Sequence, residues 1–87
     1  MKRETIALGA AIRDARTARR LTQGEAALRG GMTQSEWSRI ERGAADTLVL
    51  TFIRFARAIG ITPGTLLSRA VRNMDADARP AEDEPPA

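Results

Sequence analysis

Two copies of one helix-start signal constrain the fold of this chain more than any other feature. Thr22 is followed three positions later by Glu25, and Thr33 is followed in the same way by Glu36. In this capping-box pattern, the threonine hydroxyl and the glutamate carboxylate each accept a hydrogen bond from the other residue's backbone N–H. Glycines at positions 30 and 31 favour the end of the first of these helices. The pattern therefore predicts two short helices across one tight turn, the second over residues 33–42.

Apolar spacing predicts a helix before this pair and another after it. Leucine, isoleucine and alanine recur at helical spacing in a first helix over residues 6–20, at Leu8, Ile12 and Ala15. After the pair, either Asp46 or Thr47 is expected to cap a helix that ends at Gly60. The residues expected to face inward in that helix are Val49, Phe52, Ile53, Ala56 and Ile59.

The last predicted helix begins at Thr62 and Pro63, an N-cap followed by proline at the first helical position. Its apolar residues are Leu66, Leu67 and Val71. Residues 73–87 are rich in Asp, Glu, Pro and Ala, and a segment of this composition buries too little apolar surface to offset the entropy of ordering. The prediction is an all-α, five-helix domain over residues 1–72, with a disordered acidic tail over residues 73–87.

Composition excludes several classes of function. The 87 residues contain neither cysteine nor histidine, so a disulfide framework, a thiolate or imidazole metal site and the commonest general base are all missing. We expect no enzyme, no cofactor and no metal. No apolar run approaches the length of a membrane span, and no signal-peptide core follows the N-terminus, so we expect a cytoplasmic protein without membrane contact. The formal net charge of +3 is concentrated before the acidic tail and suits a polyanionic partner.

The helix predicted over residues 33–42 has two chemically different sides. Projection at helical spacing gathers hydrogen-bonding side chains in one arc, namely Gln34, Ser35, Ser38, Arg39 and Arg42. Thr33, Trp37 and Ile40 lie opposite. Glutamine can bond adenine, arginine can bond guanine, and serine can bond base edges or phosphates. Taken alone, such an arc is also what an ordinary solvated helix face looks like.

The order of these elements resembles the Cro/repressor-like (XRE) family of bacterial helix-turn-helix regulators over residues 8–68. The matching pieces are Leu8-Gly9, Ile12-Arg13, Arg16, Leu21-Thr22-Gln23, Ala27, Met32-Thr33-Gln34-Ser35, Ser38-Arg39-Ile40-Glu41-Arg42-Gly43 and residues 56–60. The resemblance implies a lambda-repressor-like fold in which the third helix enters the major groove and the second crosses the DNA backbone.

Residue roles follow from this resemblance position by position. It implies base contacts by Gln34, Ser35, Ser38 and Arg39. It implies contacts to the DNA backbone by Thr22, Gln23, Thr33, Arg42, Arg13 and Arg19. Arg16 and Glu41 match a pair that joins the first helix to the third, so their implied role is structural.

Three departures from the family pattern bear on the core and on one turn. Trp37 stands where many relatives carry a smaller aliphatic residue, whereas Ala26 and Gly30 replace larger side chains. We expect the indole to fill the volume that the second helix leaves, away from the polar arc. Arg20 occupies a position where relatives commonly have glycine in a left-handed conformation, which is sterically costly for arginine.

The function that these residues predict is that of a sequence-specific transcriptional regulator, a repressor that binds double-stranded operator DNA as a homodimer. Phe52, Phe55 and Leu67 are candidates for the dimer interface, with completion of the monomer core as their alternative role. The alternative function is that of an antitoxin, which would bind a small toxin protein as well as operator DNA.

Overall fold

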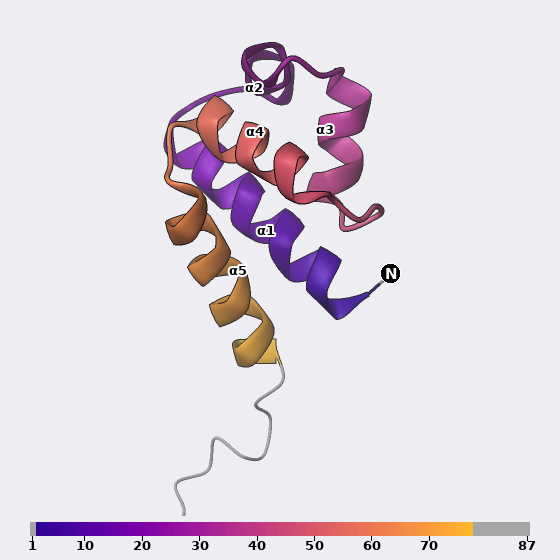
Figure 1. Ribbon diagram of the computed structural model, residues 1–87, viewed down its shortest axis with the longest axis vertical. Coiled ribbons are helices and arrows are strands. Elements are labelled where there is room, and N and C mark those ends of the chain that lie inside the picture. Colours follow the sequence, from indigo (N-terminus) through magenta and orange to yellow (C-terminus); the bar gives the residue numbers. More distant parts are fainter. Residues whose placement is uncertain (1, 78–87) are drawn as a thin grey trace, which may run out of the picture.

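The computed structural model describes residues 2–77, and these form five helices and no strand. The helices are α1 (Arg3–Ala18), α2 (Gln23–Gly30), α3 (Gln34–Glu41), α4 (Val49–Ile59) and α5 (Pro63–Asp77). The predicted all-α class and the number of helices are confirmed. Figure 1 shows α1 and α5 running side by side in opposite directions, while α2 and α3 lie at the other end of the molecule from the last turn of α5.

The core is built around two aromatic rings. Trp37 and Phe55 are both fully buried, and their ring centroids lie 4.4 Å apart with the planes tilted by 43°. Other large, fully buried side chains come from α1, α4 and α5, namely Ile12, Ile59 and Leu66. Ala26 and Ala27 of α2 belong to the same cluster, so small side chains surround the large indole as the sequence predicts.

The first helix begins and ends earlier than predicted. It starts at Arg3 and ends at Ala18, two residues before the predicted boundary at Arg20. Arg20 adopts a φ of +58°, the left-handed conformation that its position implies, and its N–H donates to the carbonyl of Thr17 at 2.9 Å. This left-handed residue ends the helical run and turns the chain toward α2.

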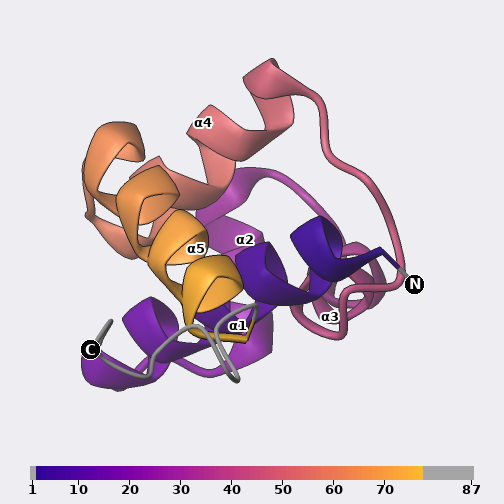
Figure 2. The same cartoon turned by 90° about the horizontal axis from the view of Figure 1, so that it is seen from below.

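The predicted cap of α4 is wrong. Neither Asp46 nor Thr47 caps the helix, because Leu48 is the N-cap residue and makes no side-chain hydrogen bond to it. The carboxylate of Asp46 instead lies 3.4 Å from the ammonium group of Lys2, and the Thr47 hydroxyl donates to the Leu48 carbonyl. Figure 2 shows the long connection over residues 42–48 that carries the chain from α3 to this start of α4.

The buried face of α4 also differs from the prediction. Val49 is 74% exposed, and Phe52 and Ile53 are only partly buried. The buried residues of the helix are Phe55, Ala56, Ala58 and Ile59. The difference arises because the start of α4 is exposed, with Leu48, Val49 and Leu50 all largely accessible, so most of the buried residues of the helix lie in its second half.

The fifth helix starts as predicted and continues to Asp77, past the expected start of the tail. The Thr62 hydroxyl accepts a hydrogen bond from the N–H of Thr65 at 3.3 Å, as an N-cap does. In the last turns, the side-chain amide of Asn73 donates to the carbonyl of Ala7 at 3.2 Å. Leu66 is buried, whereas Leu67 and Val71 are 53% and 44% exposed. The rest of the predicted tail, residues 78–87, lies outside the described residues.

None of the helices formed by residues 2–77 combines the length and the apolar character that crossing a membrane requires.

Candidate nucleic-acid interface

Both capping boxes are present and set the start of α2 and of α3. The Thr22 hydroxyl accepts from the N–H of Glu25 at 3.0 Å, and the Glu25 carboxylate accepts from the N–H of Thr22 at 2.8 Å. Thr33 and Glu36 make the same two bonds with the same lengths. The boundaries predicted for both helices are confirmed because the signals that define them are local.

The turn between these helices depends on Gly31. Its φ of +69° is left-handed, and the N–H of Met32 reaches back to the carbonyl of Ala27 at 3.0 Å. This bond closes the end of α2 and directs the chain into Thr33. The two helices and the turn together form a helix-turn-helix unit.

Helix α3 is divided between solvent and core as its pattern predicts. Gln34, Ser35 and Arg39 are exposed, and Ser38 is partly buried beside them. Trp37 and Ile40 are buried on the opposite side, Glu41 is buried in the last turn, and Thr33, which was predicted to lie with Trp37 and Ile40, is exposed as the N-cap residue. The four residues expected to contact bases therefore lie on the outer side of one helix, with their polar groups free of the core.

A glycine in α2 leaves room for the first side chain of α3. A Cβ built at Gly24 would lie 3.3 Å from the Oε1 atom of Gln34. The amide of Gln34 thus lies against the first turn of α2, where the N–H groups of Gln23 and Gly24 precede the first intrahelical hydrogen bonds. These N–H groups and the positive end of the helix dipole are suited to holding a phosphate next to Gln34.

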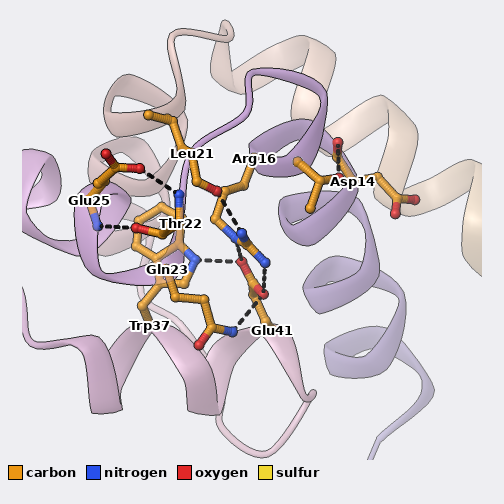
Figure 3. Close-up of polar contacts among 9 residues, drawn as sticks. Asp14, Arg16, Leu21, Thr22, Gln23, Glu25, Trp37 and Glu41 are labelled. Atoms are coloured by element: carbon orange, nitrogen blue, oxygen red, sulfur yellow. Dashed lines mark hydrogen bonds and ion pairs between the residues drawn. The ribbon is translucent and has the colours of Figure 1, made fainter.

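A buried carboxylate joins three helices behind this surface (Figure 3). Glu41 accepts hydrogen bonds from the Nε and Nη2 atoms of Arg16, at 2.6 and 3.0 Å. It also accepts from Gln23 Nε2 at 2.9 Å and from Trp37 Nε1 at 2.5 Å. Arg16 further donates from Nη1 to the carbonyl of Leu21 at 2.7 Å. The expected Arg16–Glu41 ion pair is therefore the centre of a network that includes α1, α2 and α3.

The pKa of Glu41 is lowered in the folded protein. Burial by itself raises the pKa of this carboxyl, but the hydrogen bonds from Arg16, Gln23 and Trp37 and the positive charge of Arg16 outweigh burial. The pKa values of Glu25 and Glu36 are also lowered, first by the backbone N–H of the capping threonine and then by its hydroxyl. All three glutamates are therefore ionised at neutral pH.

The residues expected to contact the DNA backbone differ in their exposure and in the hydrogen bonds that their side chains already make. Arg13 and Arg42 are exposed. The side-chain amide of Gln23 gives one of its two N–H donors to Glu41, so the second side-chain N–H and the backbone N–H are the donors that Gln23 can offer to a phosphate. Arg19 lies at the far end of α4, where its guanidinium donates to the carbonyl of Gly60 at 3.1 Å. Thr22 and Thr33 use their hydroxyls to cap their helices.

Two residues contribute to this arrangement in ways that the sequence pattern does not predict. Trp37 was expected only to fill volume, but its indole N–H also binds Glu41, one helical turn away on the same helix. Gly9 lets α1 approach α3, because a Cβ built there would contact the Ile40 carbonyl oxygen and lie 2.5 Å from that of Glu41. The spacing of Trp37 and Glu41 is a signal that could have revealed the first contact.

The geometry defines a class of protein: a helix-turn-helix domain whose third helix carries an outward polar face, as in DNA-binding regulators. Comparison with protein families gives the same answer, since the model of a helix-turn-helix domain matches residues 7–70. The chain belongs to this helix-turn-helix family.

Two solved structures resemble the chain closely. The clp gene regulator ClgR of Corynebacterium glutamicum is 27% identical and superimposes with a TM-score of 0.83, over 86% of this chain and 80% of that one. The restriction-modification controller protein C.AhdI of Aeromonas hydrophila is 28% identical and superimposes with a TM-score of 0.70. The match covers 72% of this chain and 91% of the C.AhdI chain. A search among curated proteins finds no match. The fold and the class of DNA-binding helix-turn-helix regulators are thus established by family and structure together.

Proposed function

We propose that this protein is a sequence-specific transcriptional regulator, a repressor, that reads the major groove of an operator with α3. The observation that carries the proposal is the outward polar side of α3 in a capped helix-turn-helix unit, with Gln34, Ser35 and Arg39 exposed. Their amide, hydroxyl and guanidinium groups match the donors and acceptors of base edges. Ser38, half-buried beside them, is the fourth proposed base contact.

Contacts to the DNA backbone are proposed for the rim of this surface. The backbone N–H groups of Gln23 and Gly24 at the start of α2 would hold one phosphate. The guanidinium groups of Arg13 and Arg42 are exposed and would reach others, which adds affinity without sequence preference. Thr22 and Thr33 support these contacts by fixing the helix starts. Arg19 is retained as a backbone contact only if its bond to Gly60 is released.

The proposed active form is a homodimer on a two-fold symmetric site in the cytoplasm. Exposed apolar side chains lie at the start of α4, namely Leu48 before the helix and Val49 and Leu50 in its first turn, and on α5, at Leu67 and Val71. A groove of 270 Å³ between α1, α4 and α5 continues this surface and is lined by Val49, Phe52, Leu67 and Met74 among others. Exposed apolar patches of this kind mark interaction sites, and a palindromic operator requires a second copy of the same chain.

This surface revises the candidates for the interface. Phe55 is fully buried against Trp37, so of its two expected roles the completion of the monomer core is the one that fits, and it is no longer a candidate for dimer contacts. Phe52 lines the groove, and Leu67 is more than half exposed beside it. Both remain candidates for contacts between two copies.

Selection of bound sequences from a random pool of duplexes tests the proposal. The wild-type protein should enrich a short palindromic consensus, because two copies read two half-sites. The Gln34→Ala variant should lose preference at one position of each half-site, since a bidentate contact to a base contributes about 1–3 kcal/mol of discrimination. Ser68→Ala, at an exposed site on α5, is the matched control and should select the same consensus as the wild type.

Two outcomes would contradict the proposal. A wild-type protein that enriches no sequence at low salt is not a sequence-specific regulator. A Gln34→Ala variant that keeps the full consensus removes Gln34 from the base-reading residues.

A further inference from the structure

Three arginines outside the recognition helix converge on one surface depression. Arg29 comes from the last turn of α2, and Arg54 and Arg57 lie one turn apart on α4. Together with Gly30 and Gly31 they line a depression of 380 Å³, and all three side chains are exposed. We propose that this arginine patch binds phosphates of the DNA that flanks the operator half-site, an inference that rests on the proposed function.

No ion pair within the described residues neutralises the patch, and Glu25, one helical turn before Arg29 on α2, acts on it only through a longer-range Coulombic interaction. No carboxylate lines the depression. Among residues 2–77, the ion pairs are Lys2–Asp46 and Arg16–Glu41, neither of which involves Arg29, Arg54 or Arg57. Like charges held side by side repel each other in the free protein, and a bound anion relieves that repulsion.

Helix electrostatics account for only part of the cluster. Arg29 and Arg57 lie in the last turns of their helices, where a positive side chain interacts favourably with the helix dipole. Arg54 lies in the middle of α4 and gains nothing from this effect. The dipole also gives no reason for side chains of two different helices to surround one depression.

The floor of the depression suits close approach by a backbone. Gly30 and Gly31 carry no side chains. A Cβ built at Gly31 would meet no atom within 4 Å, whereas one built at Gly30 would lie 3.1 Å from the Cε atom of Met32, so the open space is at Gly31. Guanidinium groups around such an open floor can bind phosphate oxygens through paired N–H donors.

The patch is continuous with the proposed DNA surface. A second depression, of 210 Å³, shares Gly31 and Arg54 with the first and is also lined by Arg39 of α3. The two acidic residues of this second depression are already engaged, Glu36 in its capping box and Asp46 with Lys2. A path of arginines thus leads from Arg39 through Arg54 to Arg29 and Arg57. A polyanion that contacts α3 and extends past it meets these residues next, which favours DNA over an acidic protein.

The test compares two double variants that remove the same charge. Arg54→Ala/Arg57→Ala removes two arginines of the patch. Arg69→Ala/Arg72→Ala removes two arginines with the same spacing from α5, where they line a separate depression against α1. Alanine is a stronger helix former than arginine, so neither change should weaken its helix. Binding of each protein to the selected consensus is measured between 50 and 200 mM salt, on a duplex with extended flanks and on one trimmed to the site.

The expected result is specific to the patch variant and to the long duplex. Loss of two phosphate contacts should make the negative slope of log K against log salt shallower by about 1.8, so that the affinity deficit of the patch variant is about 12-fold larger at 50 than at 200 mM salt. On the trimmed duplex this difference from the wild type should disappear. The α5 variant should keep the wild-type slope on both duplexes, and all three proteins should keep the same consensus.

Other outcomes overturn the patch proposal, and each is distinct from failure of the proposed function. Equal slopes for the wild type and the patch variant would show that the patch does not touch DNA, as expected if it served an acidic protein. If both double variants lost the same amount of DNA affinity and salt dependence, the effect would come from the lower net charge of the protein and not from the patch. If the wild type selects no sequence, the proposed function itself fails and the patch proposal falls with it.

Discussion

Replacing Glu41 with glutamine tests the central interaction of this fold with a minimal change of shape. The carboxylate receives four hydrogen bonds, from Arg16, Gln23 and Trp37. The side chains of Arg16 and Glu41 are only 11% and 2% exposed, so solvent cannot replace what the substitution removes. In the Glu41→Gln variant the side-chain NH₂ group must face donors, and the guanidinium of Arg16 loses its counter-charge.

The burial of this pair allows the loss of unfolding free energy in Glu41→Gln to be estimated. Removing one partner of a buried ion pair costs about 3–5 kcal/mol, because the remaining charge stays buried and uncompensated. A domain of this size has a total stability of about 4–13 kcal/mol. At about 4–8 °C per kcal/mol, the melting temperature should fall by at least about 12 °C.

Thermal unfolding followed by far-UV circular dichroism and by the fluorescence of Trp37 measures this loss. Glu36→Gln is the matched control, because Glu36 lies on the same helix, is exposed, and occupies a capping-box position where glutamine also functions. The control should melt close to the wild type. Because the Arg16–Glu41 pair is shielded from solvent, the deficit of Glu41→Gln should persist at high salt. A melting temperature of Glu41→Gln within a few degrees of the wild type would refute the argument.

The same carboxyl predicts a pH dependence. Its pKa is lowered on folding from an ordinary value of 4.5, so near and below that pH the unfolded chain binds a proton more readily than the folded one. The stabilisation is therefore fully present above pH 4.5 and is lost as the pH falls through the folded pKa. Glu41→Gln lacks this contribution, so its deficit relative to the wild type should shrink in acid.

Two further substitutions test packing and assembly. Gly9→Ala should destabilise the domain by at least about 1 kcal/mol in urea unfolding, because the new Cβ meets the backbone of α3 and overpacking of this kind costs about 1–3 kcal/mol. Gly64→Ala, which has open space around its Cβ, should instead stabilise the domain by about 0.5–1 kcal/mol, and similar effects at both positions would contradict the close approach of α1 and α3. Leu67→Glu should convert the dimer to a monomer in analytical ultracentrifugation, whereas Ser68→Glu, which adds the same charge away from the groove, should leave it dimeric. A wild-type protein that sediments as a monomer at high concentration would reject the proposed interface.

The parts of the fold that the sequence predicted correctly are those with local signals. Each capping box joins two residues that are three positions apart, and these boxes set the starts of α2 and α3. Gly31 and Gly60 end α2 and α4 in left-handed conformations. Each of these signals acts through hydrogen bonds between residues close in sequence, so no tertiary context is needed to interpret it.

The errors come from contacts that no local pattern encodes. Asp46 does not cap α4, because the helix begins only after Leu48, and the carboxylate of Asp46 lies instead beside Lys2, which is distant in sequence. Helix α5 extends to Asp77, and Asn73 in this extension is bonded to Ala7 of α1. Val49 is exposed at the edge of the groove between α1, α4 and α5, although its position fits the apolar pattern. The arginine patch escaped prediction for the same reason, since its members come from α2 and α4 and meet only in the folded chain.

The burial of the Glu41 network has a consequence for how this protein could change its DNA preference. The position of α2 relative to α3 is fixed behind the surface, by Arg16, Gln23, Trp37 and Glu41, rather than by the residues proposed to touch bases. Gln34, Ser35 and Arg39 are exposed and take no part in that network. Surface substitutions away from caps and buried contacts usually change stability little. If these residues contact bases as proposed, substitutions among them should change specificity while leaving the geometry that presents them, and the stability of the domain, nearly unchanged.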